Sequence, residues 1–326
     1  MSANTVISSR VRLARNYREL PFVPRMTKEQ KEALKEKLRT EVKSGPISMS
    51  YIDMAQVDDI RAGAMVEDHL ISPEFSRNRE GKALFMGQPG ACSLSVMVNE
   101  EDHLRIQAMT EGFDLESAYA LADRADDLFG DAMPYAFSEK HGYLTCCPTN
   151  LGTGLRASVM MHLPVLSETG NINRFINALS GLGLTVRGLY GEGSQPGGHF
   201  YQLSNQVSLG ITEEESLLRL KDSAKKIEES ELSLQKKYLQ NISVKDRIHR
   251  AYGILKEARL LSSSEFLKLV SDVRWGILQG ELSGELEKLD RLFSKAQPYN
   301  LMISSPEDTA EQRDTKRAEL VRNTLG

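Results

Sequence analysis

The 326-residue sequence contains only three cysteines and one tryptophan, and it has no long apolar run. Cys92, Cys146 and Cys147 cannot pair evenly, and their spacing matches neither a zinc site nor a secreted disulfide framework. No apolar stretch approaches the length that crosses a bilayer, and the opening residues lack the apolar segment of a signal peptide. We therefore expect a soluble protein in a reduced, cytoplasmic setting.

A strong charge of either sign is also missing, because the formal net charge is −4 and the pI is near 6.0. Such a balance gives no general attraction to nucleic acid or to a membrane surface. The phosphate-binding motifs G-x-x-x-x-G-K-[ST] and G-x-G-x-x-G are absent, and no residues have the spacing of a metal site. If a nucleotide binds, arginines must hold its phosphates, because a guanidinium stays charged and offers a planar fork of donors.

The first half of the chain predicts a helix followed by a sheet. Thr27 and Gln30 form a capping signal for a helix that we expect to end near Gly45. Between residues 84 and 210, short segments rich in β-branched and aromatic residues predict a mostly antiparallel sheet. The expected strands are LSVMVN, GYLTC, ASVMMHL, LTVRGLY and HFYQLSN, with helices around residues 114–129 and 173–182 covering one face.

After Gly210 the pattern becomes helical almost without interruption. Capping signals at Thr212 and Ser262 each precede a long polar and apolar periodic segment. Ser305, followed by a proline, predicts the start of the final helix. The sequence therefore indicates an α+β fold in which a catalytic region, residues 1–211, precedes a helical domain, residues 212–326.

Three consecutive acids, Glu100, Glu101 and Asp102, follow the expected strand LSVMV and precede Arg105. Like charges crowded in this way are unfavourable unless a cation approaches them. A guanidinium or a magnesium ion would be such a cation. The alternative is a helix N-terminus, where acidic side chains interact well with the helix dipole. The residues alone leave both interpretations open.

Two further stretches combine glycine with reactive or charged side chains. Residues 146–158, CCPTNLGTGLRAS, place two thiols and Arg156 around a glycine-rich turn. Cys147 is either a small buried hydrophobe or a thiolate that nearby arginines stabilise. Residues 191–198, GEGSQPGG, carry Glu192 as their only ionisable side chain. Four glycines in that stretch favour a mobile substrate loop over a simple hairpin turn.

Several of these blocks occur in an order that resembles the phosphagen kinases, the arginine and creatine kinases. The blocks are SSRVRLARN, NEEDHLRI, CPTNLGTGLRAS, a glycine-rich acidic loop, YQLSN and LGITEEE. The resemblance covers about residues 6–215. It implies the family's catalytic fold, an antiparallel sheet flanked by helices and similar to glutamine synthetase. It also implies phosphoryl transfer from ATP to a guanidinium, with Mg²⁺ as cofactor.

The same resemblance implies a role for individual side chains. Glu101 would be the catalytic acid, Cys147 the active-site thiolate, and His69 would lie on the adenine side of the nucleotide. The positions that would hold the ATP phosphates are Arg10, Arg12, Arg105, Arg156 and Arg187.

The glycine-rich loop departs from the family pattern. Tyr190 stands where the metabolite kinases have an arginine, and Gln195 stands where they have a second acid. We therefore expect Arg187 and Glu192 to perform the role of the loop, with Glu192 as a second catalytic acid.

The two ends of the chain also differ from the metabolite kinases. Those kinases carry a helical domain of about a hundred residues, a typical domain size, before the first block. Here only the stretch MSANTVISS precedes Arg10, so we expect an acceptor site open to an arginine side chain of another protein. The C-terminal segment RDTKRA is similar to the family branch that phosphorylates arginines in proteins. That similarity implies a phosphoarginine pocket of Arg313, Asp314 and Arg317, whereas the residues alone also fit a surface salt-bridge ladder.

The expected function is therefore an ATP-dependent kinase of arginine side chains that marks proteins for regulated proteolysis and controls a heat-shock repressor. The resemblance implies several partners: arginine-exposing protein substrates, a zinc-binding activator protein, a heat-shock transcriptional repressor, a AAA+ protease and a second copy of the chain. We expect no direct contact with nucleic acid or membrane. Two alternatives stay open, a kinase of free arginine or another small guanidino metabolite, and a non-catalytic adaptor that binds phosphoarginine.

Overall fold

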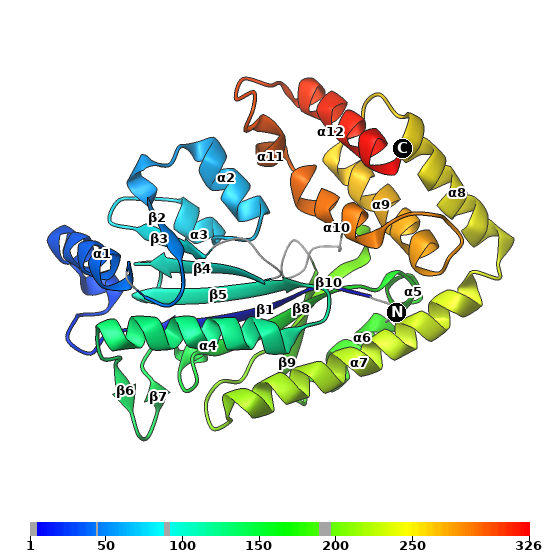
Figure 1. Ribbon diagram of the computed structural model, residues 1–326. Coiled ribbons are helices and arrows are strands. Elements are labelled where there is room, and N and C mark those ends of the chain that lie inside the picture. The colour runs from blue at the N-terminus through cyan, green and yellow to red at the C-terminus, as the bar shows by residue number, and fades with distance from the viewer. Residues whose placement is uncertain (1–4, 44, 88–91, 189–196) are drawn as a thin grey trace.

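The structure, a computed structural model, describes residues 5–43, 45–87, 92–188 and 197–326. The predictions for Tyr190, Glu192 and Gln195 lie outside the described residues. The centre of the molecule is an eight-stranded sheet of order β2-β3-β4-β5-β1-β8-β10-β9, in which every neighbouring pair is antiparallel (Figure 1). The strands are β1 Val6–Arg15, β2 Met49–Asp53, β3 Ala83–Gly87, β4 Cys92–Val98, β5 Leu104–Glu111, β8 Leu155–His162, β9 Leu184–Gly188 and β10 Phe200–Asn205.

The expected antiparallel sheet is confirmed, but one predicted strand is wrong. The segments LSVMVN, ASVMMHL, LTVRGLY and HFYQLSN fall on β4, β8, β9 and β10. GYLTC instead contributes only β7, Gly142–Tyr143, to a separate hairpin with β6, Phe137–Ser138. At Gly142 the chain has a φ of 68° and packs against the backbone of Gly152, so it turns away from the main sheet.

Helices cover one face of this sheet, as the sequence predicts. The helix α1, Lys28–Val42, begins at the capping box of Thr27 and Gln30, and α4, Leu115–Ala132, is capped by Asp114. The buried side chains of α4 recur every three or four residues and pack on β1, β4 and β5. The predicted helix at residues 173–182 is α6, Ile172–Ser180.

Strand periodicity divides β1 between two environments. Val11 and Leu13 point toward α4 and are almost fully buried in the main core. Arg10 and Arg12 alternate with them and therefore lie on the opposite face. At one end of that opposite face, α2, Asp59–Glu67, and α3, Pro73–Ser76, form a second small core.

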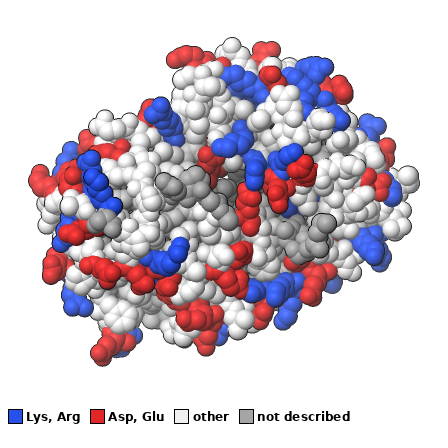
Figure 2. All heavy atoms as spheres, in the orientation of Figure 1, with Lys and Arg blue, Asp and Glu red and all other residues white. Residues whose placement is uncertain are grey.

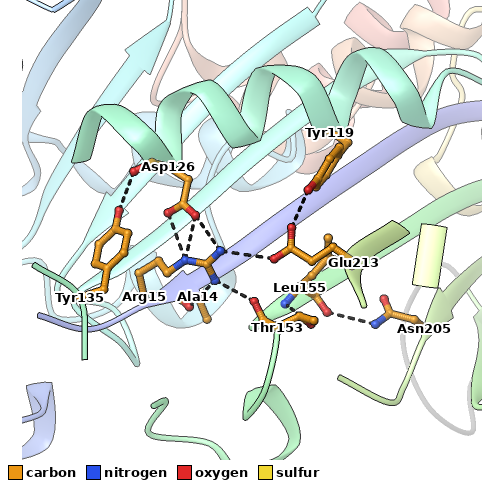
Figure 3. Close-up of polar contacts among 9 residues, drawn as sticks. All are labelled: Ala14, Arg15, Tyr119, Asp126, Tyr135, Thr153, Leu155, Asn205 and Glu213. Atoms are coloured by element: carbon orange, nitrogen blue, oxygen red, sulfur yellow. Dashed lines mark hydrogen bonds and ion pairs between the residues drawn. The ribbon is translucent and has the colours of Figure 1, made fainter. Parts of the chain in front are cut away.

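Arg15 occupies the buried face, unlike the two arginines that precede it. Its guanidinium donates from Nε and Nη2 to the Asp126 carboxylate, with the shortest contact at 2.7 Å (Figure 3). Its Nη1 donates to the carbonyl of Thr153 at 2.8 Å. The guanidinium also stacks 3.6 Å from the ring centroid of Tyr143. Arg15 therefore ties β1 and α4 to the turn that contains Cys146 and Cys147.

The rest of the chain is helical. The helices are α7 Glu213–Tyr238, α8 Ile242–Glu257, α9 Ser263–Leu278, α10 Leu286–Lys295, α11 Pro298–Met302 and α12 Ala310–Leu325. Leu220 and Ala224 of α7 still pack in the core under the sheet, whereas α8 to α12 surround a separate core that includes Trp275. The boundary at residue 212 therefore stays a prediction, since packing continues across it. None of the helices in the described residues has the length and apolarity to cross a membrane.

The predicted capping signals of these helices have mixed outcomes. The capping box of Thr212 is confirmed, and Ser262 accepts a hydrogen bond from the backbone of Glu265. The predicted start of the last helix at Ser305 is wrong, because α12 begins at Ala310. Residues 303–307 form turns instead, and Thr309 makes a complete capping box with Gln312.

The first testable prediction concerns the buried Arg15–Asp126 pair. Asp126→Asn would leave the buried Arg15 charge with only the more distant carboxylate of Glu213, 3.5 Å from Nη2, so we expect the free energy of unfolding to fall by about 3 kcal/mol. Urea unfolding followed by circular dichroism measures this loss. Asp127→Asn, in the next position of α4 but exposed, is the matched control and should change stability by less than about 0.5 kcal/mol. Equal stabilities of the two variants would contradict the prediction.

Candidate active site

Five of the arginines singled out from the sequence gather on the sheet face that is turned away from α4. In the antiparallel register, Arg12 of β1 lies opposite Arg156 of β8, and Arg105 of β5 lies opposite Ala14. Cross-strand partners share a face, so these side chains lie together with Arg10. Arg187 of β9 pairs with Gln202, whose side chain accepts a 3.0 Å hydrogen bond from Arg10. Strand pairing thus brings side chains that lie up to 177 positions apart in the sequence, from 10 to 187, into one cluster.

The positive charges of this cluster perturb each other. Burial, followed by the charges of Arg105 and Arg156, lowers the pKa of Arg10 to about 10. Burial and the same neighbours also hold the pKa of Arg12 well below its usual value, with only Glu100 acting in the opposite direction. Within the described residues, the buried Nε atoms of Arg12 and Arg156 have no hydrogen-bond partner. A face of guanidinium groups with unused donors is suited to a polyanion such as a triphosphate.

His69 lies next to this cluster. It follows the end of α2 with a φ of 58°, and its carbonyl accepts a 2.6 Å hydrogen bond from Gln107, which stands opposite Arg12 on the sheet. His69 is exposed at the surface, yet the protein atoms crowded around its imidazole, and then the charge of Arg10, lower its pKa to about 4, against an opposing effect of Asp68. The imidazole is therefore neutral near pH 7 and can contact an uncharged base beside the phosphates.

The three consecutive acids lie in the turn between β4 and β5, so the helix interpretation is wrong. Asn99 begins the turn with a φ of 61°, and its amide donates to the carbonyl of His103 at 2.9 Å. Asparagine tolerates this left-handed conformation better than most residues, which lets the chain reverse directly into β5.

The structure gives each of the three acids a different environment. Glu100 forms a 2.7 Å ion pair with Arg105 and accepts a hydrogen bond from Ser72. Burial acts to raise the pKa of Glu100, but the Arg105 charge and these hydrogen bonds outweigh it and hold the pKa below the usual range. Asp102 is buried and accepts from the Asn16 side chain and from the backbone of Cys146.

Glu101 is the acid of this turn that is left exposed. No other described residue engages its carboxylate in a hydrogen bond or ion pair. Partial burial, followed by the charges of Asp102 and Glu100, raises the pKa of Glu101, and Arg105 opposes them. The cation that the three acids were expected to need is Arg105 in the case of Glu100. The carboxylate of Glu101 is available to a cation of a bound molecule.

The two neighbouring thiols also differ. Burial, followed by the charge and hydrogen bonding of Asp102, raises the pKa of Cys146 to about 12. The Sγ of Cys147 lies 3.0 Å from the hydroxyl of Thr149, and Cys147 acts electrostatically on Arg156. Cys147 thus faces the arginine cluster, whereas Cys146 is held as a neutral thiol beside the acid turn.

Asp102 and Asn16 are positioning residues to which the sequence analysis gave no role. Asn16 donates to Asp102 from its side chain and accepts from the backbone of His103, so it joins the end of β1 to the acid turn. Asp102 in turn holds the backbone of Cys146 at 2.7 Å. Asn16 lies in the block LARN and Asp102 in the block NEED. Their place inside these blocks is the sequence feature that could have indicated a role.

The remaining predicted residues lie elsewhere. Arg317 of α12 is 1% exposed and donates to the carbonyls of Ala296 and Leu261, each at 2.7 Å, and it also pairs with Asp314. Arg313 donates to the carbonyl of Asp308 at 2.8 Å. These three α12 residues belong to the helical domain and are not part of the arginine cluster on the sheet. In Figure 2, acidic and basic side chains gather around the hollow between the sheet and the C-terminal helices.

Comparison with known proteins agrees with this geometry. Residues 29–234 match the family described as ATP:guanido phosphotransferase, C-terminal catalytic domain. The chain belongs to this family. It is therefore an enzyme that transfers a phosphoryl group between ATP and a guanidino group, as the sequence analysis predicted. Residues 241–326 match a second family, described as the protein-arginine kinase McsB C-terminal domain.

The chain is also similar to named kinases and to kinases whose structures have been solved. The chain is 44% identical to the protein-arginine kinase of Caldanaerobacter subterraneus subsp. tengcongensis, over 99% of this chain and 97% of that protein. It is 43% identical to that of Halothermothrix orenii, over 98% and 93%. The Schistosoma mansoni taurocyamine kinase with transition-state analogue components has a TM-score of 0.64 and 28% identity, over 70% of this chain and 33% of that chain. A lombricine kinase has a TM-score of 0.61 and 26% identity, over 71% and 67%.

The second prediction concerns the thiols of this phosphotransferase. We expect iodoacetamide at pH 8 to modify Cys147 well before Cys146, because the thiolate is the reactive form and the pKa of Cys146 is raised to about 12. Peptide mass spectrometry after a short reaction measures the labelled fraction at each position. Cys147→Ser is the control and should remove the early label. Early labelling of Cys146 in that variant would contradict the assignment.

The third prediction concerns the crowded arginines. Arg12→Met removes one of several buried like charges, so we expect the melting temperature of the ligand-free protein to rise by about 2 °C. The additional stabilisation by Mg-ATP should largely disappear, because ligand stabilisation follows affinity. Thermal unfolding with and without nucleotide measures both effects. Arg124→Met, exposed on α4, is the control that should preserve the nucleotide effect. Full stabilisation of Arg12→Met by ATP would argue against the phosphate role.

Proposed function

We propose that this enzyme transfers the γ-phosphoryl group of ATP to the guanidinium of arginine side chains in proteins. The observation that carries the proposal is the arginine cluster on one sheet face beside Glu101, a carboxylate that no described residue engages. The names of relatives at 43 and 44% identity that match nearly the whole chain support a protein acceptor. The match of residues 241–326 to the C-terminal domain of such kinases supports it further.

In the proposed reaction, the arginines of the cluster hold the triphosphate and neutralise charge that develops during transfer. Glu100 orients Arg105 through their ion pair, and the neutral His69 lies on the base side. Among the described residues, no group of three or more His, Cys, Asp and Glu could hold a metal ion. We therefore place Mg²⁺ on the nucleotide phosphates and water, which is its usual mode of binding.

The acceptor is a guanidinium, whose nitrogen attacks well only after its charge and position are controlled. Glu101 accepts hydrogen bonds from the substrate guanidinium and aligns one nitrogen with the γ-phosphorus. Its raised pKa favours acceptance of the proton that leaves as the N–P bond forms and the bond from the γ-phosphorus to the bridging oxygen breaks, releasing ADP. Glu192 is the proposed second carboxylate of this clamp, and Cys147 contacts the guanidinium from the side of Arg156.

The proposal also includes regulation. Arg313, Asp314 and Arg317 would form a pocket for phosphoarginine in the helical domain, which would require the buried Arg317 to exchange its carbonyl acceptors for phosphoryl oxygens. A zinc-binding activator, a heat-shock repressor as substrate, a AAA+ protease and a homodimer through the C-terminal helices complete the proposed setting, in the cytoplasm.

The fourth prediction tests the acceptor and the base together. With radiolabelled ATP, we expect label on an unfolded arginine-rich protein and none on free arginine, in a product that is labile in acid. Glu101→Gln should lower the turnover number at least about a hundredfold, because it removes a group that acts in the transition state. Scintillation counting after protein precipitation measures the transfer.

Glu139→Gln provides the control, since Glu139 is also exposed but lies in the β6–β7 hairpin. Transfer to free arginine alone would favour the metabolite-kinase alternative. Binding of phosphoarginine without ATP consumption for any protein substrate would favour the non-catalytic adaptor.

A further inference from the structure

Helix α11 of the helical domain rests directly on α2 of the catalytic region, although their sequences are more than 200 residues apart. The ring of Tyr299 in α11 lies against Gly63 in α2, where an added Cβ would come within 2.4 Å of that ring. Lys295, before α11, lies 3.5 Å from Asp68. Figure 1 shows α11 reaching from the helical domain toward α2, above the strands that carry the arginines.

Glu67 makes the central polar contact of this junction. Its carboxylate accepts hydrogen bonds from the backbone amides of Tyr299 at 2.9 Å and Asn300 at 2.7 Å. These amides lie in the first turn of α11, which has no cap from its own preceding residue, Gln297. Free amides at a helix start attract a carboxylate, so Glu67 performs from another part of the chain the task of a capping residue.

The contact continues to the nucleotide side of α2. Glu67 is the last residue of α2, Asp68 follows it and accepts from the Asn300 side chain at 3.1 Å, and His69 comes next. The carbonyl of His69 accepts from Gln107, which pairs with Arg12 in the sheet. His69 thus bonds to the sheet through its carbonyl and directly follows two residues, Glu67 and Asp68, that are bound to α11.

The helical domain holds α11 from its opposite side through α12. Arg317 donates to the carbonyl of Ala296, just before α11, and Arg313 contacts the sulfur of Met302 at the end of α11. Arg317 thus holds the start of α11 and Arg313 holds its end. These two contacts give α11 a defined place in the helical domain. A five-residue helix would not be stable without such contacts.

We propose that Glu67 is a positioning residue through which α11 of the helical domain completes the nucleotide site. The inference rests on the proposed role of the arginine face and His69 in binding ATP. In this view, the carboxylate of Glu67 anchors the end of α2 to α11, and the anchored end of α2 sets the left-handed backbone of His69 next to Arg10. The helical domain therefore contributes to ATP affinity without touching the nucleotide.

The test is the effect of Glu67→Gln on nucleotide affinity in the full-length protein. The substitution preserves size but removes the charge that interacts with the α11 amides, so we expect the Kd for Mg-ATP to rise about tenfold. The KM for ATP should rise by a similar factor, while the turnover number at saturating ATP and the KM for the protein acceptor stay within about twofold. Isothermal titration calorimetry measures the affinity, and steady-state kinetics measures the separation of KM from the turnover number.

Gly63→Val approaches the same junction by a different route. Its side chain would collide with the Tyr299 ring and displace α11 while leaving Glu67 unchanged, so the same loss of ATP affinity is expected. Glu111→Gln is the matched control, because Glu111 also joins the catalytic region to the helical domain, through Arg291, but on an exposed surface at the end of β5. Its Kd for Mg-ATP should equal that of the unmodified protein.

The outcomes separate this inference from the proposed function. If the unmodified protein fails to bind Mg-ATP, both the proposed function and this inference fall. If it binds and transfers normally but Glu67→Gln and Gly63→Val bind Mg-ATP with unchanged Kd, Glu67 has no positioning role and the proposed function stands. A fall in turnover number with unchanged KM for ATP would also overturn the inference, because it would place the defect in chemistry.

Discussion

The structure is organised around the electrostatic cost of gathering guanidinium groups on one face of an antiparallel sheet. Strand pairing fixes Arg12 opposite Arg156 and brings Arg10 and Arg105 beside them, and burial prevents water from screening their charges fully. Glu100 offsets only part of this charge. The face is therefore suited to an anion. Repulsion among its guanidinium groups lowers the stability of the free protein, as is typical of a binding site.

The groups around this face are held by a network that does not itself meet the substrate. Arg15 points to the opposite side of β1, where it forms an ion pair with Asp126 and donates a hydrogen bond to the carbonyl of Thr153. These contacts hold the turn that carries Cys146 and Cys147 next to the sheet. Asp102 joins the acid turn to the same thiol-bearing turn through the backbone of Cys146. Glu101 and Cys147 thus project from two turns whose relative position is fixed by buried polar contacts, as a reaction that depends on placement requires.

Several contacts join the helical domain to the catalytic region, and two of them lie on opposite sides of the sheet. Helix α7 continues the apolar packing under the sheet, while α11 reaches α2 on the other side through Glu67 and Tyr299. The second contact leads to the face with the arginines, since His69 follows Glu67 and Asp68 in the chain. A domain without a described residue in the arginine cluster can therefore influence the nucleotide side through the backbone of α2.

The sequence alone determined much of this protein, because its local signals are strong. Capping boxes at Thr27 and Thr212, together with short segments rich in β-branched and aromatic residues, predicted the α+β class and most elements, and the ordered sequence blocks predicted the family. Ser305 and the proline after it predicted a helix start that is wrong, because the complete capping box lies at Thr309 and Gln312. The tertiary structure alone decided which acid of the NEED block has no partner among the described residues, since Ser72 and Arg105 engage Glu100 while Asn16 engages Asp102.

Tertiary structure likewise decided that Arg15 pairs with Asp126, that Cys146 is held as a thiol, and that Glu67 caps a helix more than 200 residues away. Each of these facts is a pairing between segments that are distant in sequence, and residue identity carries no information about such distances. The sequence thus determines which chemical groups are present and the local periodicity that orients them. The folded chain determines which charges remain uncompensated, because compensation depends on three-dimensional neighbours.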